Sequence, residues 1–144
     1  MNFLKKFKDM KNLLLQKENI YYIILIIIIF SLDRFSKIII VSSFNEGTYF
    51  INNFINLDLI WNTGIGFGFL SSNSPIFYNS VTFIVGLTII ILFYFFIISK
   101  NFEKLIYSII IGGACGNFYD RLIYNAVPDF IDLHYNSFHW FTFN

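Results

Sequence analysis

Four short polar clusters in this sequence stand beside long apolar runs, where charge is costly if the runs cross a membrane. A charged side chain near the middle of a bilayer costs roughly 2.5–3.5 kcal/mol on insertion scales, so such residues usually mark function. The clusters read LDRFSK, WNTGIGFGF, GGACGNFYDR and VPDFIDLH. Their carboxylates are groups that can activate water, and their amides and guanidinium can hydrogen-bond a peptide backbone.

The first two clusters each have a structural alternative. Asp33 and Lys37 are four residues apart, so on a helix they would share a face and pair. Such a pair could anchor the end of a span or face a substrate cavity. Asn62 can donate and accept hydrogen bonds, and the glycines beside it permit backbone shapes barred to other residues. These glycines are Gly64, Gly66 and Gly68. The alternative is an ordinary loop, and no phosphate loop is indicated because no Lys-Ser or Lys-Thr pair follows.

The third and fourth clusters could contribute a pair of carboxylates. Asn117 and Arg121 are four residues apart on one expected helix face, although the cluster could also be a charge-neutral helix cap. Asp120 and Asp129 are nine residues apart, which on a continuous helix places them on opposite sides. Pro128 disfavours continuation of the helix, and a turn there could bring Asp129 back. Spacing alone neither proves nor excludes that the two carboxylates form a pair.

A carboxylate dyad is the hydrolytic chemistry that these residues leave open. His134 and His139 lack the spacing and cysteine partners that zinc requires, so we expect no metal and a surface or interfacial role for both. Cys115 lies among glycines and is expected to pack, and no serine has the context of a nucleophile elbow. In a dyad one carboxyl keeps a proton while its ionised partner draws a proton from water.

The elements that must position these clusters are expected to be membrane spans. Of the 144 residues 56% are hydrophobic and 13% charged, which is more apolar surface than a soluble domain of this size can hide. The net charge of +1 offers no basic surface for nucleic acid. We therefore expect one membrane domain over residues 1–144, with an all-α integral membrane helix bundle as its fold class. A span takes about 20 residues, and three are expected, at about 20–44, 75–99 and 102–118.

Lysine placement predicts the orientation of the bundle. Lysines precede the first expected span, which lacks a cleavage site, and Lys100 and Lys104 separate the second and third. These segments belong in the cytoplasm, including residues 1–19. Residues 45–74 would then form a small, strand-rich outer platform. Residues 119–144 would form an outer segment leading to a fourth span that this sequence does not include, so three spans are expected of four.

In this order the four clusters together resemble the lipoprotein signal peptidase family, also called signal peptidase II, of aspartic peptidase family A8. Its D-x-x-x-K element looks like Asp33 to Lys37, and its G-G-x-x-G-N-x-x-D-R element is present from Gly112 to Arg121. Its V-x-D-F-I-D element matches Val127 to Asp132. Its N-x-G-x-x-F-G loop is matched by Asn62, Gly64, Phe67 and Gly68. The resemblance covers nearly the whole chain.

The resemblance implies a four-helix protein of the bacterial cytoplasmic (inner) membrane, with its amino terminus in the cytoplasm and its active site at the outer face. Such an endopeptidase removes the signal peptide from diacylglyceryl-modified prolipoproteins by cleaving before the lipid-modified cysteine. It needs no metal or organic cofactor. Its expected partners are these prolipoproteins and membrane lipids, and we expect it to act as a monomer.

The resemblance also implies a role for particular residues. Asp129 would be the first catalytic aspartate. The residues that would contact the substrate backbone, or the inhibitor globomycin, are Asn62, Asn117 and Arg121. The residues that would shape the site are Asp33, Lys37, Gly64, Asp120 and Asn144. The family's second aspartate lies in F-N-x-A-D, and the final Phe-Asn pair of this sequence resembles its start. We therefore expect the second catalytic aspartate beyond Asn144, and no peptidase activity from the 144 residues alone.

Two alternatives belong to other functional classes. A non-enzymatic small carrier could use the polar cavity, although it would need polar residues through the second span, which has almost none. A pseudo-enzyme could bind lipopeptides through the same amides without cleaving them.

Overall fold

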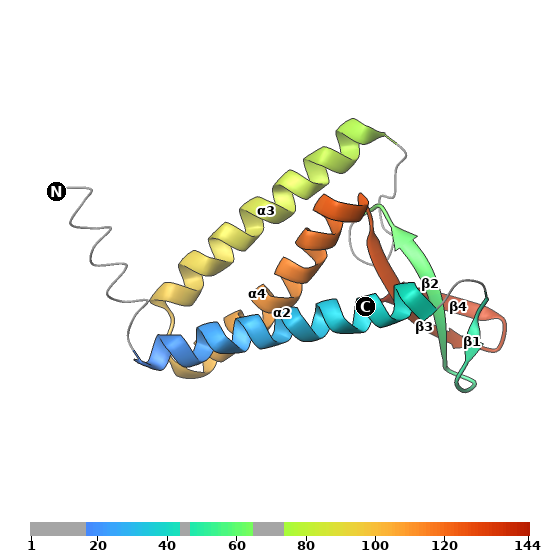
Figure 1. Cartoon of the computed structure of the whole chain (residues 1–144), viewed down its shortest axis with the longest axis horizontal. Helices are drawn as coiled ribbons and strands as arrows, with labels where there is room; N and C mark the ends of the chain where they lie inside the picture. The colour runs from blue at the N-terminus through green and yellow to red at the C-terminus, as the bar shows by residue number, and fades with distance from the viewer. Residues whose placement is uncertain (1–16, 44–46, 65–73) are drawn as a thin grey trace.

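Three long helices and a four-stranded sheet make up the part of the chain described by the computed structural model, residues 17–43, 47–64 and 74–144 (Figure 1). The helices are α2 (Lys17–Ser43), α3 (Pro75–Ile98) and α4 (Asn101–Tyr124). The strands are β1 (Tyr49–Phe50), β2 (Ile55–Asn62), β3 (Val127–Tyr135) and β4 (Phe138–Phe143). Figure 1 shows the sheet beyond the carboxyl ends of α2 and α4.

The helix boundaries follow local sequence signals. The Ser74 side chain caps α3 by accepting a hydrogen bond from the backbone N–H of Phe77, and Pro75 occupies the first turn, where its missing N–H costs nothing. α4 ends at Tyr124 because Asn125 adopts a left-handed conformation with φ 53°. It therefore extends past residue 118, the expected end of the third span, and stops before Pro128.

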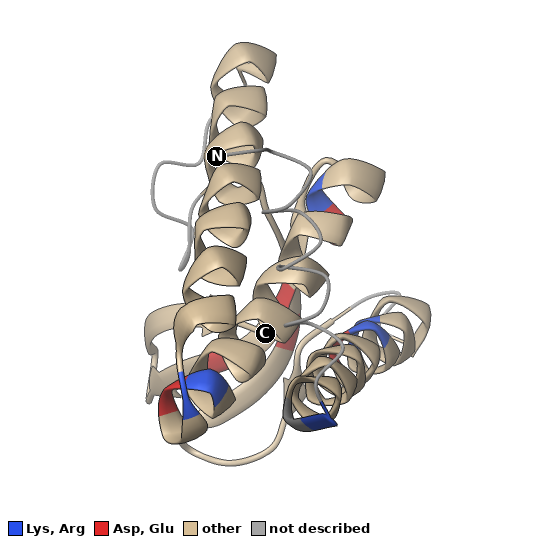
Figure 2. Cartoon of the chain, turned by 90° about the vertical axis from the view of Figure 1, so that its left-hand side faces the viewer, with Lys and Arg blue, Asp and Glu red and all other residues tan. Residues whose placement is uncertain are grey.

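α3 is the one helix in the described ranges that is long and apolar enough by composition to cross a membrane, with a mean hydropathy of 2.8. It carries no charged residue and is tan along its whole length in Figure 2. α2 and α4 carry charges, and part of this charge faces the other helix. The helical part of the expected bundle is thus present, while the membrane boundaries of the spans stay a prediction.

Close packing of α2 against α4 depends on two glycines. A Cβ atom on Gly112 would lie 2.6 Å from Cβ of Ile29, and a Cβ atom on Gly116 would overlap the carboxylate of Asp33. Small residues of this kind let helix backbones approach closely. An apolar core next to this contact packs the three helices together, with Ile26 from α2, Phe96 from α3 and Ile111 from α4.

The sheet is antiparallel throughout, in the order β1-β2-β3-β4. Its registers place Ile60 opposite Asp129 and Asn62 opposite Val127, after an irregularity between Leu57 and Ile60. Strand structure in residues 45–74 was expected. Strands in the segment 119–144 were not, and that segment supplies both β3 and β4. The fold is therefore a helix bundle with a substantial sheet, and half of the sheet comes from the carboxyl-terminal segment.

Candidate active site

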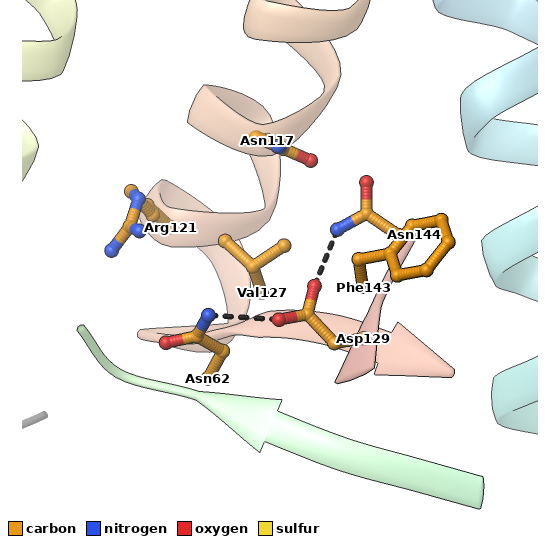
Figure 3. A pocket seen from close by; sticks show the side chains of 7 residues that line it. All are labelled: Asn62, Asn117, Arg121, Val127, Asp129, Phe143 and Asn144. Atoms are coloured by element: carbon orange, nitrogen blue, oxygen red, sulfur yellow. Dashed lines mark hydrogen bonds between the residues drawn. The ribbon is translucent and has the colours of Figure 1, made fainter. Parts of the chain in front are cut away.

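A small pocket of about 140 Å³ lies where the end of α4 meets the sheet (Figure 3). β2 and α4 contribute amides and a guanidinium to it, β3 contributes a carboxylate, and the last two residues of the sequence close it. The lining residues are Asn62, Asn117, Arg121, Val127, Asp129, Phe143 and Asn144.

Asp129 is the carboxylate of this pocket, and two amides hold it. Nδ2 of Asn62 donates to Oδ2 at 2.8 Å, and Nδ2 of Asn144 donates to Oδ1 at 2.5 Å, so Figure 3 shows the carboxylate between the two side chains. The residue is only 5% exposed. Burial raises the pKa of Asp129, and the two hydrogen bonds offset this only in part. The result is a carboxyl that holds its proton at a higher pH than an exposed aspartate does.

The turn between α4 and β3 places Asp129 in the pocket. The left-handed Asn125 ends the helix, and the chain reverses into β3, whose first residues are buried. Pro128 is fully buried next to the carboxylate and pairs with Trp61 across the sheet. The turn foreseen as one alternative is therefore present, but it brings Asp129 to Asn62 and not to Asp120.

Arg121 is fixed on one side and unpaired on another. It donates through Nη2 to the carbonyl oxygen of Gly64, whose N–H in turn donates to Oδ1 of Asn62 at 2.8 Å. The hydroxyl of Tyr78 donates to the backbone oxygen of Arg121 at 2.8 Å. Within the described residues the buried Nη1 of Arg121 has no hydrogen-bond partner. A guanidinium nitrogen of this kind can donate to an acceptor on a bound molecule.

An ion network lies behind Asn117, between α2 and α4. Nζ of Lys37 donates to Oδ1 of Asn117 at 2.6 Å and lies 2.9 Å from Oδ1 of Asp33. The same nitrogen forms an ion pair at 2.8 Å with Oδ2 of Asp120, without hydrogen-bond alignment, and Arg34 pairs with Oδ1 of that carboxylate. Lys37 and Asp120 are 1% and 0% exposed. The expected pairing of Asp33 with Lys37 is confirmed as an ion pair facing the bundle interior.

The structure divides the expected site residues into two groups. The first lines the pocket and comprises Asn62, Asn117, Arg121, Asp129 and Asn144. The second supports it and comprises Asp33, Lys37, Gly64 and Asp120. Asp129 is the one carboxylate that lines the pocket within residues 17–43, 47–64 and 74–144. Phe67 and Gly68, which carry part of the resemblance, lie outside the described residues, as does Gly66.

Arg34 and Tyr78 were missed as contributors to the site. Arg34 stands within LDRFSK, so its place between Asp33 and Lys37 was a usable signal. Tyr78 is a single tyrosine near the start of an apolar helix, and only its bond to the backbone of Arg121 reveals its role.

His134 does not lie on the surface, so that part of the expected surface or interfacial role is wrong for it, and an interfacial role stays a prediction. Its side chain is buried because alternation along β3 places residues 130, 132 and 134 on one covered face. Its ring stacks on that of the exposed His139, whose Nδ1 lies 2.7 Å from Oδ2 of Asp132. No group of three or more His, Cys, Asp or Glu residues in the described ranges is arranged to hold a metal ion. Cys115 packs against the apolar core, as expected.

Comparisons with known proteins agree on one family. The family model described as signal peptidase (SPase) II, Peptidase_A8, matches residues 25–144. A lipoprotein signal peptidase of Pelagibacter ubique (strain HTCC1062) is 44% identical over 131 residues, which cover 88% of this chain and 79% of the relative. One from Anaplasma marginale (strain Florida) is 39% identical over 133 residues, covering 89% and 76%.

Solved structures with this fold are also similar in sequence. One described as a bacterial membrane enzyme solved by the in meso method at 2.3 Å resolution has a TM-score of 0.67 and 29% identity, covering 85% of this chain and 76% of that one. Another, solved by the same method at 1.9 Å resolution, has a TM-score of 0.65 and 28% identity, covering 83% and 81%.

Proposed function

This chain belongs to the signal peptidase II family of peptidases, and from that premise we propose that it removes the signal peptide from prolipoproteins by cleaving before the lipid-modified cysteine. The observation that carries the proposal is the buried Asp129, held by two amides in a pocket of backbone-binding groups. We further propose that the pocket lies at the outer face of the bacterial inner membrane, with the amino terminus in the cytoplasm. We also propose that it acts as a monomer, as the family resemblance implies.

Asp129 would act as one of two carboxylates that titrate together. The ionised carboxylate accepts a proton from water, and the water oxygen attacks the scissile carbonyl carbon. The protonated carboxyl donates a hydrogen bond to the carbonyl oxygen as the tetrahedral intermediate forms. The carboxyl that accepted the proton from water then donates it to the nitrogen of the leaving amine as the C–N bond breaks. The raised pKa of Asp129 suits it to sharing a proton with a second carboxylate.

Asn144 is the residue of this sequence nearest to the second aspartate that the resemblance implies. Its amide already contacts Oδ1 of Asp129. An aspartate three residues further along the chain would lie within about 10 Å of Asn144, because an extended chain spans at most about 3.3–3.6 Å per residue. The dyad expected from the family resemblance is therefore within reach of this pocket.

The remaining lining groups would bind the substrate backbone. Asn62, Asn117 and Arg121 present amides and a guanidinium, which are suited to peptide carbonyl and N–H groups. The substrate's apolar signal segment would lie along the helices, which expose many large apolar side chains. Those of α3 include Phe83, Ile84, Ile90 and Tyr94. Access from the bilayer is therefore part of the proposal.

The test is cleavage of a lipidated prolipoprotein peptide by a chain extended beyond Asn144 through an aspartate and a fourth span. We expect cleavage by this chain and none by its Asp129→Asn variant. The control is Asp58→Asn, which changes a half-buried carboxylate on β2 away from the pocket and should cleave normally. Undiminished cleavage by Asp129→Asn would remove the catalytic assignment.

A second candidate, lipopeptide binding without cleavage, is favoured for residues 1–144 alone. Asp129 is the one carboxylate among the described pocket residues, and a dyad needs two. We expect this form to bind the peptide or globomycin without turnover. Cleavage by this form would contradict the dyad mechanism. The carrier alternative gains no support from α3, which has no charged residue.

A further inference from the structure

We propose that Arg34 is a positioning residue for this reaction, holding Asp120 so that Lys37 keeps the amide of Asn117 turned toward the pocket. The proposal rests on the proposed function, since it assigns Asn117 a role toward a peptide. It concerns a residue outside the motif positions that carry the family resemblance.

The orientation of the Asn117 amide follows from Lys37. An ammonium group only donates hydrogen bonds, so the atom of Asn117 that lies 2.6 Å from Nζ is its oxygen. The other end of the amide, Nδ2, is then the group that can donate into the pocket. A donor at this position selects a carbonyl oxygen, which is what a peptide backbone offers.

Lys37 can hold Asn117 only while the charges around it balance. Its ammonium has three protons and three oxygen neighbours, on Asp33, Asp120 and Asn117. Two of these neighbours are carboxylates. Arg34 neutralises the other oxygen of Asp120, so the buried network holds two cations and two anions.

Arg34 is itself held in place by aromatic rings. Its guanidinium carbon lies 4.5 Å from the ring centre of Tyr119 and 5.9 Å from that of Tyr124. Loss of Arg34 would leave two carboxylates, the buried Asp120 and the half-buried Asp33, facing one ammonium. The excess negative charge would draw Nζ toward Asp120 and away from the neutral amide, because charged acceptors bind ammonium more strongly than neutral ones. Asn117 would then lose its fixed orientation.

The test compares two cations that each join α2 to α4. Arg34→Met removes the one beside Asp120. Lys104→Met removes the matched one, which is 8% exposed and donates to Oδ1 of Asn19 at 2.7 Å, away from the pocket. The first readout is the side-chain amide NMR signal of Asn117 in the ligand-free protein in detergent. The second is the affinity for a prolipoprotein signal peptide with a lipid-modified cysteine.

We expect Arg34→Met to shift the Asn117 signal and to weaken peptide binding roughly 3- to 10-fold, the loss expected for one hydrogen bond to the peptide. Lys104→Met should lower thermal stability with neither change. The double variant Arg34→Met/Asp120→Asn removes one anion with the cation, so it should restore both the signal and the affinity.

An unmoved Asn117 signal in Arg34→Met, or no recovery in the double variant, overturns the proposal. If Arg34→Met does not fold, the signal is measured in Arg34→Gln. Glutamine keeps an amide donor for Asp120 but removes the positive charge, so a shift in the same direction is expected, and no shift overturns the proposal. The NMR readout needs no ligand. Failure of the wild-type chain to bind peptide would therefore count against the proposed function and leave the role of Arg34 to be judged separately.

Discussion

Asp129 shows how burial and hydrogen bonding compete at one residue. Loss of water raises the pKa of its carboxyl more than the amides of Asn62 and Asn144 lower it. An aspartate on an open surface would be ionised throughout the neutral range. This one is adjusted by its surroundings toward holding a proton, which is what one member of a dyad must do.

This raised pKa predicts how stability depends on pH. The folded state binds the proton of Asp129 more tightly than the unfolded state does, so the carboxyl contributes stability below its ordinary pKa of 3.8. That contribution is lost as the pH rises through the raised pKa. Because asparagine cannot ionise, Asp129→Asn should unfold at a higher temperature than the wild type at pH 7, with the difference disappearing near pH 4. Thermal unfolding followed with a thiol-reactive dye at Cys115, the single cysteine, measures this. A lower unfolding temperature for the variant at pH 7 would contradict it.

Asn62 is expected to set the acidic limit of activity. Its Nδ2 donates to Oδ2 of Asp129 and so favours the ionised form. Asn62→Leu removes this donor, raises the pKa of Asp129 further, and should move the acid limb of kcat/KM to higher pH in a cleaving, extended chain. Asn79→Leu, which removes an exposed amide on α3, should leave the limb in place. An unmoved or lower limb in Asn62→Leu would show that this hydrogen bond does not control the carboxyl.

At the scale of elements, the contact between α2 and α4 fixes the ion network and one wall of the pocket. The carboxylate of Asp33 lies against Gly116 on α4, in the space that a larger side chain would fill. The ion network therefore fits only because this residue is glycine. Charge and close packing therefore depend on each other at this crossing.

Gly116→Ala and Gly113→Ala form a matched pair of tests. The new Cβ at position 116 would overlap Asp33, and overpacking of this kind costs about 1–3 kcal/mol. At position 113 nothing lies within 4 Å of the new Cβ, so alanine should be neutral or stabilise the helix by about 0.5–1 kcal/mol. Unfolding temperatures in detergent check the order, and equal temperatures for the two variants would contradict the packing argument.

Hydropathy predicted the helical elements better than the strands. The apolar runs coincide with α2, α3 and α4 because a long apolar run has few other stable structures. The strand VPDFIDLHY was not recognised, since its burial depends on pairing with the distant strand β2. The four motifs of the family resemblance identified the pocket residues. Spacing alone did not show which side chain would contact Asp129. The place of Arg34 within LDRFSK was a usable signal, but its pairing with Asp120, 86 residues away, could not be predicted from spacing.

At the scale of the whole molecule, charged residues gather between α2 and α4, while apolar residues cover the outer surfaces of the helices. α3 carries no charged residue and is tan in Figure 2. Charges of α2 and α4, by contrast, pair with each other between the two helices. A hydropathy average therefore understates how apolar the outer surfaces of α2 and α4 are. Exposed isoleucines, including Ile27, Ile38 and Ile109, lie on those surfaces. The sheet lies at one end of this arrangement, and the pocket lies between sheet and helices.

The two amides that hydrogen-bond to Asp129 lie at very different distances from it along the sequence. Asn144 is 15 residues away, within the β3–β4 hairpin, whereas Asn62 is 67 residues away. Local contacts close first during folding because they cost less loop entropy. The hairpin can thus bring Asn144 to Asp129 early, while the carboxyl is still solvated and an ordinary acid. Only docking of β2 and the helices then excludes water from the carboxyl. The pKa of Asp129 therefore rises in the last step of folding, when the pocket closes around it.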